Sequence, residues 1–186
     1  MDIKLRNLRI DKILWVDLEM TGLSPSQDLI LEVAAIATDW DFKELDTYCG
    51  VIKNEVSAIK KRMAFGSSYW DEQPDAKAGL LKQNKNGKSV KTIEKEILAF
   101  IDKNFKAGMP VLLGGNSVHM DRRFIIDKWP KIDSRLHYRM LDVSAWKVVF
   151  EGKFKDKFAK RGVHRALDDI RGSIEELQYY ITKLKK

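Results

Sequence analysis

Two carboxylates, Asp17 and Glu19, lie two residues apart in the stretch ILWVDLE. This stretch begins as an apolar run rich in β-forming residues and then alternates, which predicts a mostly buried strand over residues 13–19. Residues two apart on a strand point to the same face, so the two carboxylates repel unless a positive group lies between them. Such hard oxygen ligands favour Mg²⁺ or Mn²⁺ over Zn²⁺. The alternative is a strand whose acidic end simply runs out to solvent.

A third acid, Asp121, lies in the segment NSVHMDRRFII. Phe124, Ile125 and Lys128 follow it at the spacings of one helical face. An acid that shares a face with Phe and Ile is poorly placed for solvation alone. The alternative is an acid in the first turn of a helix, stabilised by the helix dipole and paired with a neighbouring arginine.

Asp168 and Asp169 open the last predicted helix, shortly after His164. At about 100° per residue, Asp168 lies nearly opposite the apolar stripe of that helix, whereas Asp169 lies closer to its edge. Asp169 is therefore the better candidate for an inward-facing ligand. An imidazole with an ordinary pKa near 6.5 can take a proton from water, which makes His164 a candidate base. Taken singly, acids at a helix start and a histidine in a loop are ordinary surface residues; the combination is far more specific.

The surrounding pattern predicts the elements that would position these groups. Further strands are expected within residues 29–39 and around residues 45–53, forming an antiparallel meander with the first. A helix with an apolar stripe from Ile93 to Ile101 follows Thr92, a predicted N-cap. Residues 111–113 predict a short buried strand, and apolar residues recur at helical spacing from Leu167 to Leu184. Strands first and helices interleaved later indicate an α/β domain with a mixed sheet covered by helices.

Length and composition are those of one globular domain, residues 1–186. The chain has 34 Lys and Arg against 27 Asp and Glu, and this net charge of +7 is compatible with a polyanionic partner. Cys49 is the one cysteine, and the first ten residues lack the apolar core of a signal peptide, so a cytoplasmic protein is expected. No segment has the about 20 apolar residues of a membrane span. Residues 82–91, KQNKNGKSVK, predict an exposed loop.

Four segments resemble the oligoribonucleases, which belong to the DEDDh exonuclease superfamily and have a ribonuclease H-like fold. These segments are WVDLEMTGLSP (residues 15–25), GNSVHMDRRF (115–124), HYRMLDVS (137–144) and GVHRALDDIRGSIEEL (162–177). They span nearly the whole chain, in family order. The resemblance implies a metal-dependent 3′-to-5′ exoribonuclease that cleaves dinucleotides and other very short RNAs to nucleoside 5′-monophosphates.

The resemblance also assigns the catalytic centre. It places the acidic quartet on Asp17, Glu19, Asp121 and Asp169, and the general base on His164. Two Mg²⁺ or Mn²⁺ ions roughly 3.5–4 Å apart would stabilise the attacking and leaving oxygens of phosphodiester hydrolysis.

The same resemblance implies contacts to both ends of a short RNA. Leu23 would wedge against a base, and Trp70 would stack on one, with core packing as the alternative for Trp70. Ser117 would lie near the 3′-terminal nucleotide, whereas Arg139 and Ser144 would hold the 5′ phosphate. Tyr138, and His137 beside it, would reach across a homodimer into the neighbouring site; the alternative is an interface or surface tyrosine.

The chain departs from the family pattern after the tryptophan. Asp75 stands where the family usually has a histidine, and Ala78 where it has a serine, so nucleotide affinity or base preference is expected to differ. His119 receives no role. Two other functions stay open on the sequence alone: a related exonuclease that trims longer RNA or DNA, and a noncatalytic RNA-binding module.

Overall fold

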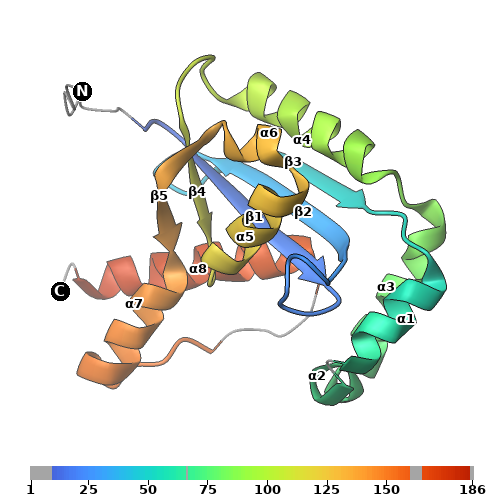
Figure 1. The fold of residues 1–186 in the computed structure, drawn as a ribbon. Helices are drawn as coiled ribbons and strands as arrows, with labels where there is room; N and C mark the ends of the chain where they lie inside the picture. Colours follow the sequence, from blue (N-terminus) through green and yellow to red (C-terminus); the bar gives the residue numbers. More distant parts are fainter. Residues whose placement is uncertain (1–9, 66, 160–164, 185–186) are drawn as a thin grey trace.

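The computed structural model describes residues 10–65, 67–159 and 165–184, and its centre is one five-stranded sheet (Figure 1). The strand order is β3-β2-β1-β4-β5. The strands are β1 (Ile13–Met20), β2 (Ile30–Thr38), β3 (Glu44–Val51), β4 (Val111–Gly115) and β5 (Leu136–Asp142). β1, β2 and β3 form an antiparallel meander, whereas β4 pairs parallel with both β1 and β5. The predicted meander, the short buried strand and the mixed sheet are confirmed.

Helices cover both faces of this sheet. The helices are α1 (Val56–Phe65), α2 (Ser67–Glu72), α3 (Pro74–Gln83), α4 (Val90–Asn104), α5 (His119–Lys128), α6 (Pro130–Asp133), α7 (Val143–Val149) and α8 (Ala166–Leu184). A 3₁₀ turn, η1 (Asn84–Asn86), follows α3, and a π-helical turn, η2 (Phe150–Phe154), follows α7. α4, α5 and α6 pack on one face, and α7 and α8 pack on the other. Within the described ranges, no helix combines the length and the apolar character needed to cross a bilayer.

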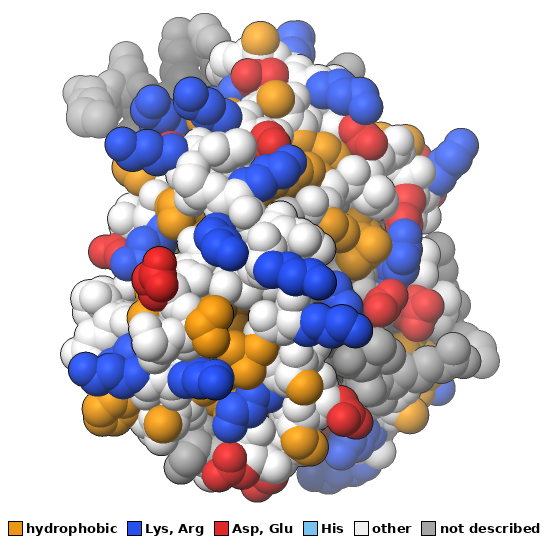
Figure 2. Space-filling view, turned by 90° about the vertical axis from the view of Figure 1, so that its right-hand side faces the viewer, with side chains coloured by type: hydrophobic (Ala, Val, Ile, Leu, Met, Phe, Trp, Pro, Cys, Tyr) orange, Lys and Arg blue, Asp and Glu red, His pale blue; other side chains and the backbone are white. Residues whose placement is uncertain are grey.

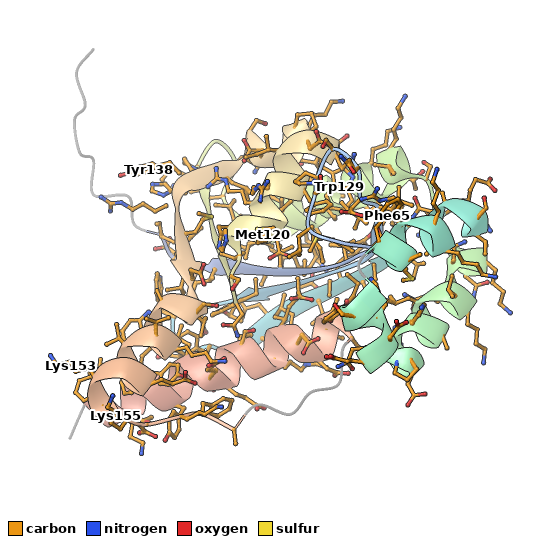
Figure 3. The ribbon with its side chains drawn as sticks, turned by 60° about the horizontal axis from the view of Figure 1, so that its bottom comes forward. Phe65, Met120, Trp129, Tyr138, Lys153 and Lys155 are labelled. Carbon is orange, nitrogen blue, oxygen red and sulfur yellow. The ribbon has the colours of Figure 1, made fainter. Side chains whose placement is uncertain are left out.

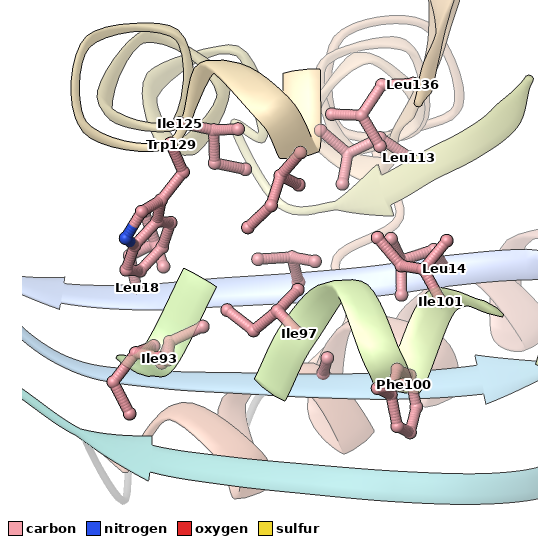
Figure 4. Close-up of a cluster of buried hydrophobic side chains, with 14 of the residues drawn as sticks. Leu14, Leu18, Ile93, Ile97, Phe100, Ile101, Leu113, Ile125, Trp129 and Leu136 are labelled. Carbon is pink, nitrogen blue, oxygen red and sulfur yellow. The ribbon is translucent and has the colours of Figure 1, made fainter. Parts of the chain in front are cut away.

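The alternation of β1 divides the core into two layers. Leu14, Val16 and Leu18 lie in the cluster that packs beneath α4 and α5 (Figure 4). Ile13 and Trp15 lie in the opposite cluster, against α8.

Because side chains alternate along a strand, Asp17 and Glu19 continue the face that turns toward α8. The strand thus changes from apolar to acidic on the face where α8 begins. This register, together with the packing of α8 on the sheet, brings the D-x-E motif and Asp169 together.

Two local predictions are wrong. α4 begins earlier than predicted, because Ser89, not Thr92, is its N-cap: the Ser89 side chain accepts the Thr92 backbone N–H at 3.1 Å. Residues 82–91 are not one exposed loop, since they include the end of α3, η1, a bridge from Lys88 to Ile52, and the start of α4. Asn84 is buried within this segment and exchanges two hydrogen bonds with Asn54.

Candidate active site

Three carboxylates gather where β1 meets the start of α8. Asp17, Glu19 and Asp169 each place a carboxylate oxygen so that all three oxygens lie within 4.8 Å of one another. All three residues are partly buried, and Asp168 beside them is exposed, as the helical spacing predicts. Three carboxylate oxygens this close together could hold a divalent cation.

The electrostatics of Glu19 fit a cation at this place. Burial raises the pKa of Glu19 to about 7, and the negative charges of Asp169 and Glu32 add to the rise. Arg165 acts in the opposite direction. A half-buried carboxylate among like charges is stabilised in its ionised form by a bound cation, so the residues fit Mg²⁺ or Mn²⁺.

Asp121 lies beside this cluster and is hydrogen-bonded to the backbone of β1, between Asp17 and Glu19. β1 pairs with β4 only from Ile13 to Trp15, which leaves the later amides of β1 without that partner. The Asp121 carboxylate accepts the Leu18 amide at 3.0 Å and is 5% exposed. Burial raises the pKa of Asp121 to about 7, although the Leu18 hydrogen bond opposes this. Asp121 is outside the group of three oxygens defined above, so the structure brings three of the four predicted ligands together and sets the fourth next to them.

Glu32 is a buried acid at the site that the sequence did not single out. It lies directly opposite Glu19 in the β1–β2 pair and is 3% exposed. Its carboxylate accepts hydrogen bonds from Gln83 and from Arg165, and Arg165 also donates to Gln83 at 3.0 Å. Arg165 directly follows the predicted base, His164, which lies outside the described residues. The one local signal is an acid within an apolar strand, and the strand sequence does not show which distant elements supply its partners.

The turn after β1 presents Leu23, which is 67% exposed. Asp28 holds this turn: its carboxylate accepts from the Thr21 hydroxyl at 3.0 Å and from the Ser24 amide at 2.9 Å. A Cβ at Gly22 would meet the Asp28 carboxylate at 2.7 Å, so a side chain here would displace the group that holds the turn. An exposed apolar side chain on a fixed turn is suited to the predicted wedge against a base.

Trp70 lies in the core. Its side chain is 2% exposed, packs in the cluster of Ile59, Met63 and Leu80, and donates from Nε1 to the Thr21 carbonyl at 2.9 Å. In this structure the ring is buried, as the alternative of core packing expects, and its faces are not open to a base. Its hydrogen bond supports the turn that carries Leu23.

Tyr69, next to Trp70, was missed by the sequence-based reasoning. It is 49% exposed and meets the Trp70 ring edge to face at 5.1 Å. Burial raises the pKa of Tyr69, and the charges of Glu19, Asp169 and Asp17 raise it further, so its hydroxyl lies near the acidic cluster. Nothing in the local sequence distinguishes it from an ordinary surface tyrosine.

Ser117 and Ser144 form a small polar site on the far side of β4. Their hydroxyl oxygens lie 2.9 Å apart, and the Ser117 amide donates to Ser144 Oγ at 2.8 Å. One Asp142 oxygen accepts both backbone amides, and the other faces His119 Nδ1 at 3.4 Å. Ser117 has a left-handed backbone with φ of 48°. The two serines therefore occupy one place, although the resemblance assigns them to opposite ends of the substrate.

The HYR segment lies on the edge strand β5. Tyr138 is 69% exposed, and Figure 3 shows it on the outer side of β5. Arg139 lies 5.3 Å from the centre of the Tyr138 ring. His137, in contrast, is 5% exposed and accepts the Arg139 amide through Nδ1 at 3.0 Å. It therefore stabilises the backbone of this segment. Arg122 donates to the His137 carbonyl at 2.7 Å and thereby ties α5 to β5.

Basic side chains are spread over the surface. Figure 2 shows Lys and Arg distributed across the face on the side of α1, α3 and α4, with hydrophobic, acidic and neutral surface between them. This face has no single unbroken basic stripe of the kind that tracks a long nucleic-acid backbone.

Comparisons with known proteins agree with this geometry. The exonuclease family model matches residues 14–177. The oligoribonuclease of Francisella tularensis subsp. novicida is 40% identical over 177 residues, which cover 94% of this chain and 96% of that protein. The oligoribonuclease of Nitrosomonas europaea is 36% identical over 174 residues, covering 91% of this chain and 93% of that one.

A solved structure supports the fold independently. E. coli exonuclease I in complex with single-stranded DNA matches with a TM-score of 0.61 at 13% identity. The match covers 96% of this chain but only 42% of exonuclease I, so it shows the ribonuclease H-like fold alone. Together with the full-length relatives, these findings show that the chain belongs to the oligoribonuclease family of DEDDh exonucleases.

Proposed function

We propose that this protein is a metal-dependent 3′-to-5′ exoribonuclease that degrades dinucleotides and other very short RNAs to nucleoside 5′-monophosphates. One observation carries the proposal: the carboxylates of Asp17, Glu19 and Asp169 converge within 4.8 Å, in a chain that matches oligoribonucleases over nearly its full length. We take residues 1–186 to act as one exonuclease domain.

Asp17, Glu19 and Asp169 would hold the metal, with Asp121 completing the set from α5. Two bound Mg²⁺ or Mn²⁺ ions would supply Lewis-acid stabilisation of the charge that develops during in-line phosphodiester cleavage. His164 would accept the proton of the attacking water. The Asp121–Leu18 hydrogen bond would keep the D-x-E backbone in register throughout.

Recognition of the short RNA would come from a few fixed groups. Leu23 would pack against one base. For Trp70, whose ring is buried, we propose that it supports the Leu23 turn in place of the base stacking that the resemblance implies. The resemblance implies a contact of Ser117 with the 3′-terminal nucleotide. Because its hydroxyl lies 2.9 Å from that of Ser144, we propose instead that both serines contact the 5′ phosphate of a dinucleotide together with Arg139.

Tyr138 would act in the neighbouring site of a homodimer, since it is exposed on an edge strand. We also propose a cytoplasmic location, which agrees with Cys49 as a free thiol.

The test is a cleavage assay on 5′-phosphorylated RNAs of increasing length, with Mg²⁺, with Mn²⁺, and with a chelator. The proposal expects the highest kcat/KM for the dinucleotide and loss of all cleavage with the chelator. Equal or faster cleavage of long RNA would reject the short-substrate specificity. Asp17→Asn serves as the purity control, because residual activity in that variant would come from a contaminating nuclease.

A further inference from the structure

A chain of mostly part-buried hydrogen bonds connects α8 with the Ser117–Ser144 site. Asn116 stands at its centre, directly after β4. Its Nδ2 donates to Ser173 Oγ at 3.0 Å and to Glu176 Oε2 at 2.9 Å. Its Oδ1 accepts from Ser144 Oγ at 3.1 Å. One amide group thus contacts both α8 and the start of α7.

The α8 end of this network is buried and fully hydrogen-bonded. Glu176 is 2% exposed, and Tyr180, which is fully buried, donates to its other oxygen at 2.8 Å. A buried carboxylate is costly unless donors satisfy it, so Asn116 and Tyr180 hold this group in a defined place. Ser173 Oγ also donates to the Asp169 carbonyl at 2.8 Å, one helical turn earlier. These bonds therefore fix the position of the Asn116 side chain relative to the helix that carries Asp169.

At its other end, the network holds Ser117 and Ser144 in place. The Ser144 hydroxyl donates to Asn116, and its oxygen then accepts the Ser117 amide at 2.8 Å. This contact helps to hold the left-handed backbone of Ser117, a conformation that a residue other than glycine adopts only when its surroundings enforce it. Ser117 itself is exposed, and its hydroxyl lies 2.9 Å from that of Ser144, so a substrate can reach the pair.

We propose that Asn116 is a positioning residue that fixes the separation between the carboxylate cluster and the Ser117–Ser144 site, and so sets the length of RNA that the enzyme prefers. The inference rests on the proposed function, because it takes the serines as the 5′-phosphate site. A rigid link between the two sites favours the one substrate whose scissile bond and terminal phosphate span that separation. A substrate of a different length would lose the contacts of its terminal phosphate, whereas the metal site would stay intact.

The experiment measures equilibrium binding in Mg²⁺ of two dinucleotides with a non-hydrolysable linkage, one with a 5′ phosphate and one without. The wild-type protein is expected to bind the phosphorylated form at least about tenfold more tightly, and Asn116→Ala to reduce this preference to within about threefold. Asn104→Ala is the matched control, since Asn104 Nδ2 also donates two hydrogen bonds, to Asp46 and to the Phe100 carbonyl, at the end of α4. This control should keep the wild-type preference.

Two variants of Glu176 separate positioning from general damage. Glu176→Gln retains an oxygen that accepts from Asn116 and should keep most of the phosphate preference, whereas Glu176→Ala should lose it. If Asn116→Ala does not fold, Ser173→Ala removes one of its two α8 partners and should weaken the preference partially. An unchanged preference in the folded variants, or an equal loss in the Asn104 control, overturns the inference.

These binding measurements, combined with the cleavage assay described above, separate the inference from the proposed function. A wild-type preference for the 5′ phosphate that depends on Asn116, in a protein that cleaves no RNA, would reject the proposed function and leave the inference standing. Efficient dinucleotide cleavage without any wild-type preference for the 5′ phosphate would do the opposite.

Discussion

The carboxylate of Asp121 accepts the backbone amide of Leu18 at 3.0 Å, and Leu18 lies between the two acids of the D-x-E motif. The bond joins residues 103 positions apart in the chain. It takes the place of a strand partner at the point where β4 no longer pairs with β1. Asp121 therefore has a structural task at the site in addition to any contact with metal.

Two substitutions at Asp121 should separate these tasks. Asp121→Asn keeps an oxygen that can accept the Leu18 amide, so the fold should be retained while activity falls. Asp121→Ala leaves a buried amide unsatisfied and should cost about 1–3 kcal/mol of unfolding free energy as well. Chemical denaturation and dinucleotide cleavage measure the two effects, and equal stability of the two variants would deny the structural task.

The adjacent acids of α8 form a matched pair for testing the metal site. Asp169→Asn removes a ligand from the cluster, whereas Asp168→Asn changes an exposed side chain on the same turn. Since even the partners of metal ligands cost roughly 10–100-fold when mutated, Asp169→Asn should lower kcat/KM by about 100-fold or more, and Asp168→Asn by less than about threefold. Metal titration calorimetry on both variants should show weakened binding only for Asp169→Asn.

The raised pKa values of Glu19 and Asp121 predict how stability depends on pH without metal. In the folded protein both groups hold protons up to about pH 7, whereas in the unfolded chain they ionise near their ordinary values of 4.5 and 3.8. The folded state binds more protons in this window, so the free energy of unfolding should fall as pH rises from about 5 to about 7.

Added Mg²⁺ should oppose this trend, because it binds the deprotonated carboxylates. Thermal unfolding at several pH values, with chelator and with Mg²⁺, provides the measurement. Glu19→Gln is the control and should show a shallower pH dependence. A metal-free melting temperature that climbs through this window would contradict the prediction.

Tyr138 allows a direct test of action across a homodimer. Tyr138→Ala and Asp17→Asn should each be nearly inactive on a dinucleotide when purified alone. Mixed under conditions that exchange subunits, they should regain activity, because a heterodimer contains one site with an intact Asp17 and a neighbour's intact Tyr138. Failure of the mixture, with exchange verified by mass spectrometry, would place Tyr138 in its own site or at the surface.

The sequence predicted the elements whose pattern is local. The strand register alone placed Asp17 and Glu19 on one face, and the helical angle correctly separated Asp169 from Asp168. The error at Thr92 arose because Ser89, one turn earlier, is an equally good cap by residue type. The structure shows that Ser89 caps the helix, directly after Lys88 bridges to Ile52.

Other features depend on tertiary contacts that no local pattern encodes. Trp70 and Tyr69 are neighbours with similar side chains, yet one lies in the core and the other near the acids, because α2 is oriented by its packing on α1 and α3. Glu32 looks like one polar residue in an apolar strand. Its partners, Gln83 and Arg165, come from 51 and 133 positions away.

The left-handed backbone of Ser117 implies a compromise between thermal stability and the preference for a 5′ phosphate. Such a conformation costs about 1–3 kcal/mol in a residue other than glycine, and glycine would relieve that strain at an entropic cost of roughly 0.5–1 kcal/mol. Ser117→Gly should therefore melt at the same temperature as the wild-type protein or above it, and yet lose discrimination for the 5′ phosphate; a lower melting temperature would show that the hydroxyl stabilises the fold. A library selected only for thermal resistance would accept glycine here, whereas one selected for turnover of the shortest RNAs would restore serine.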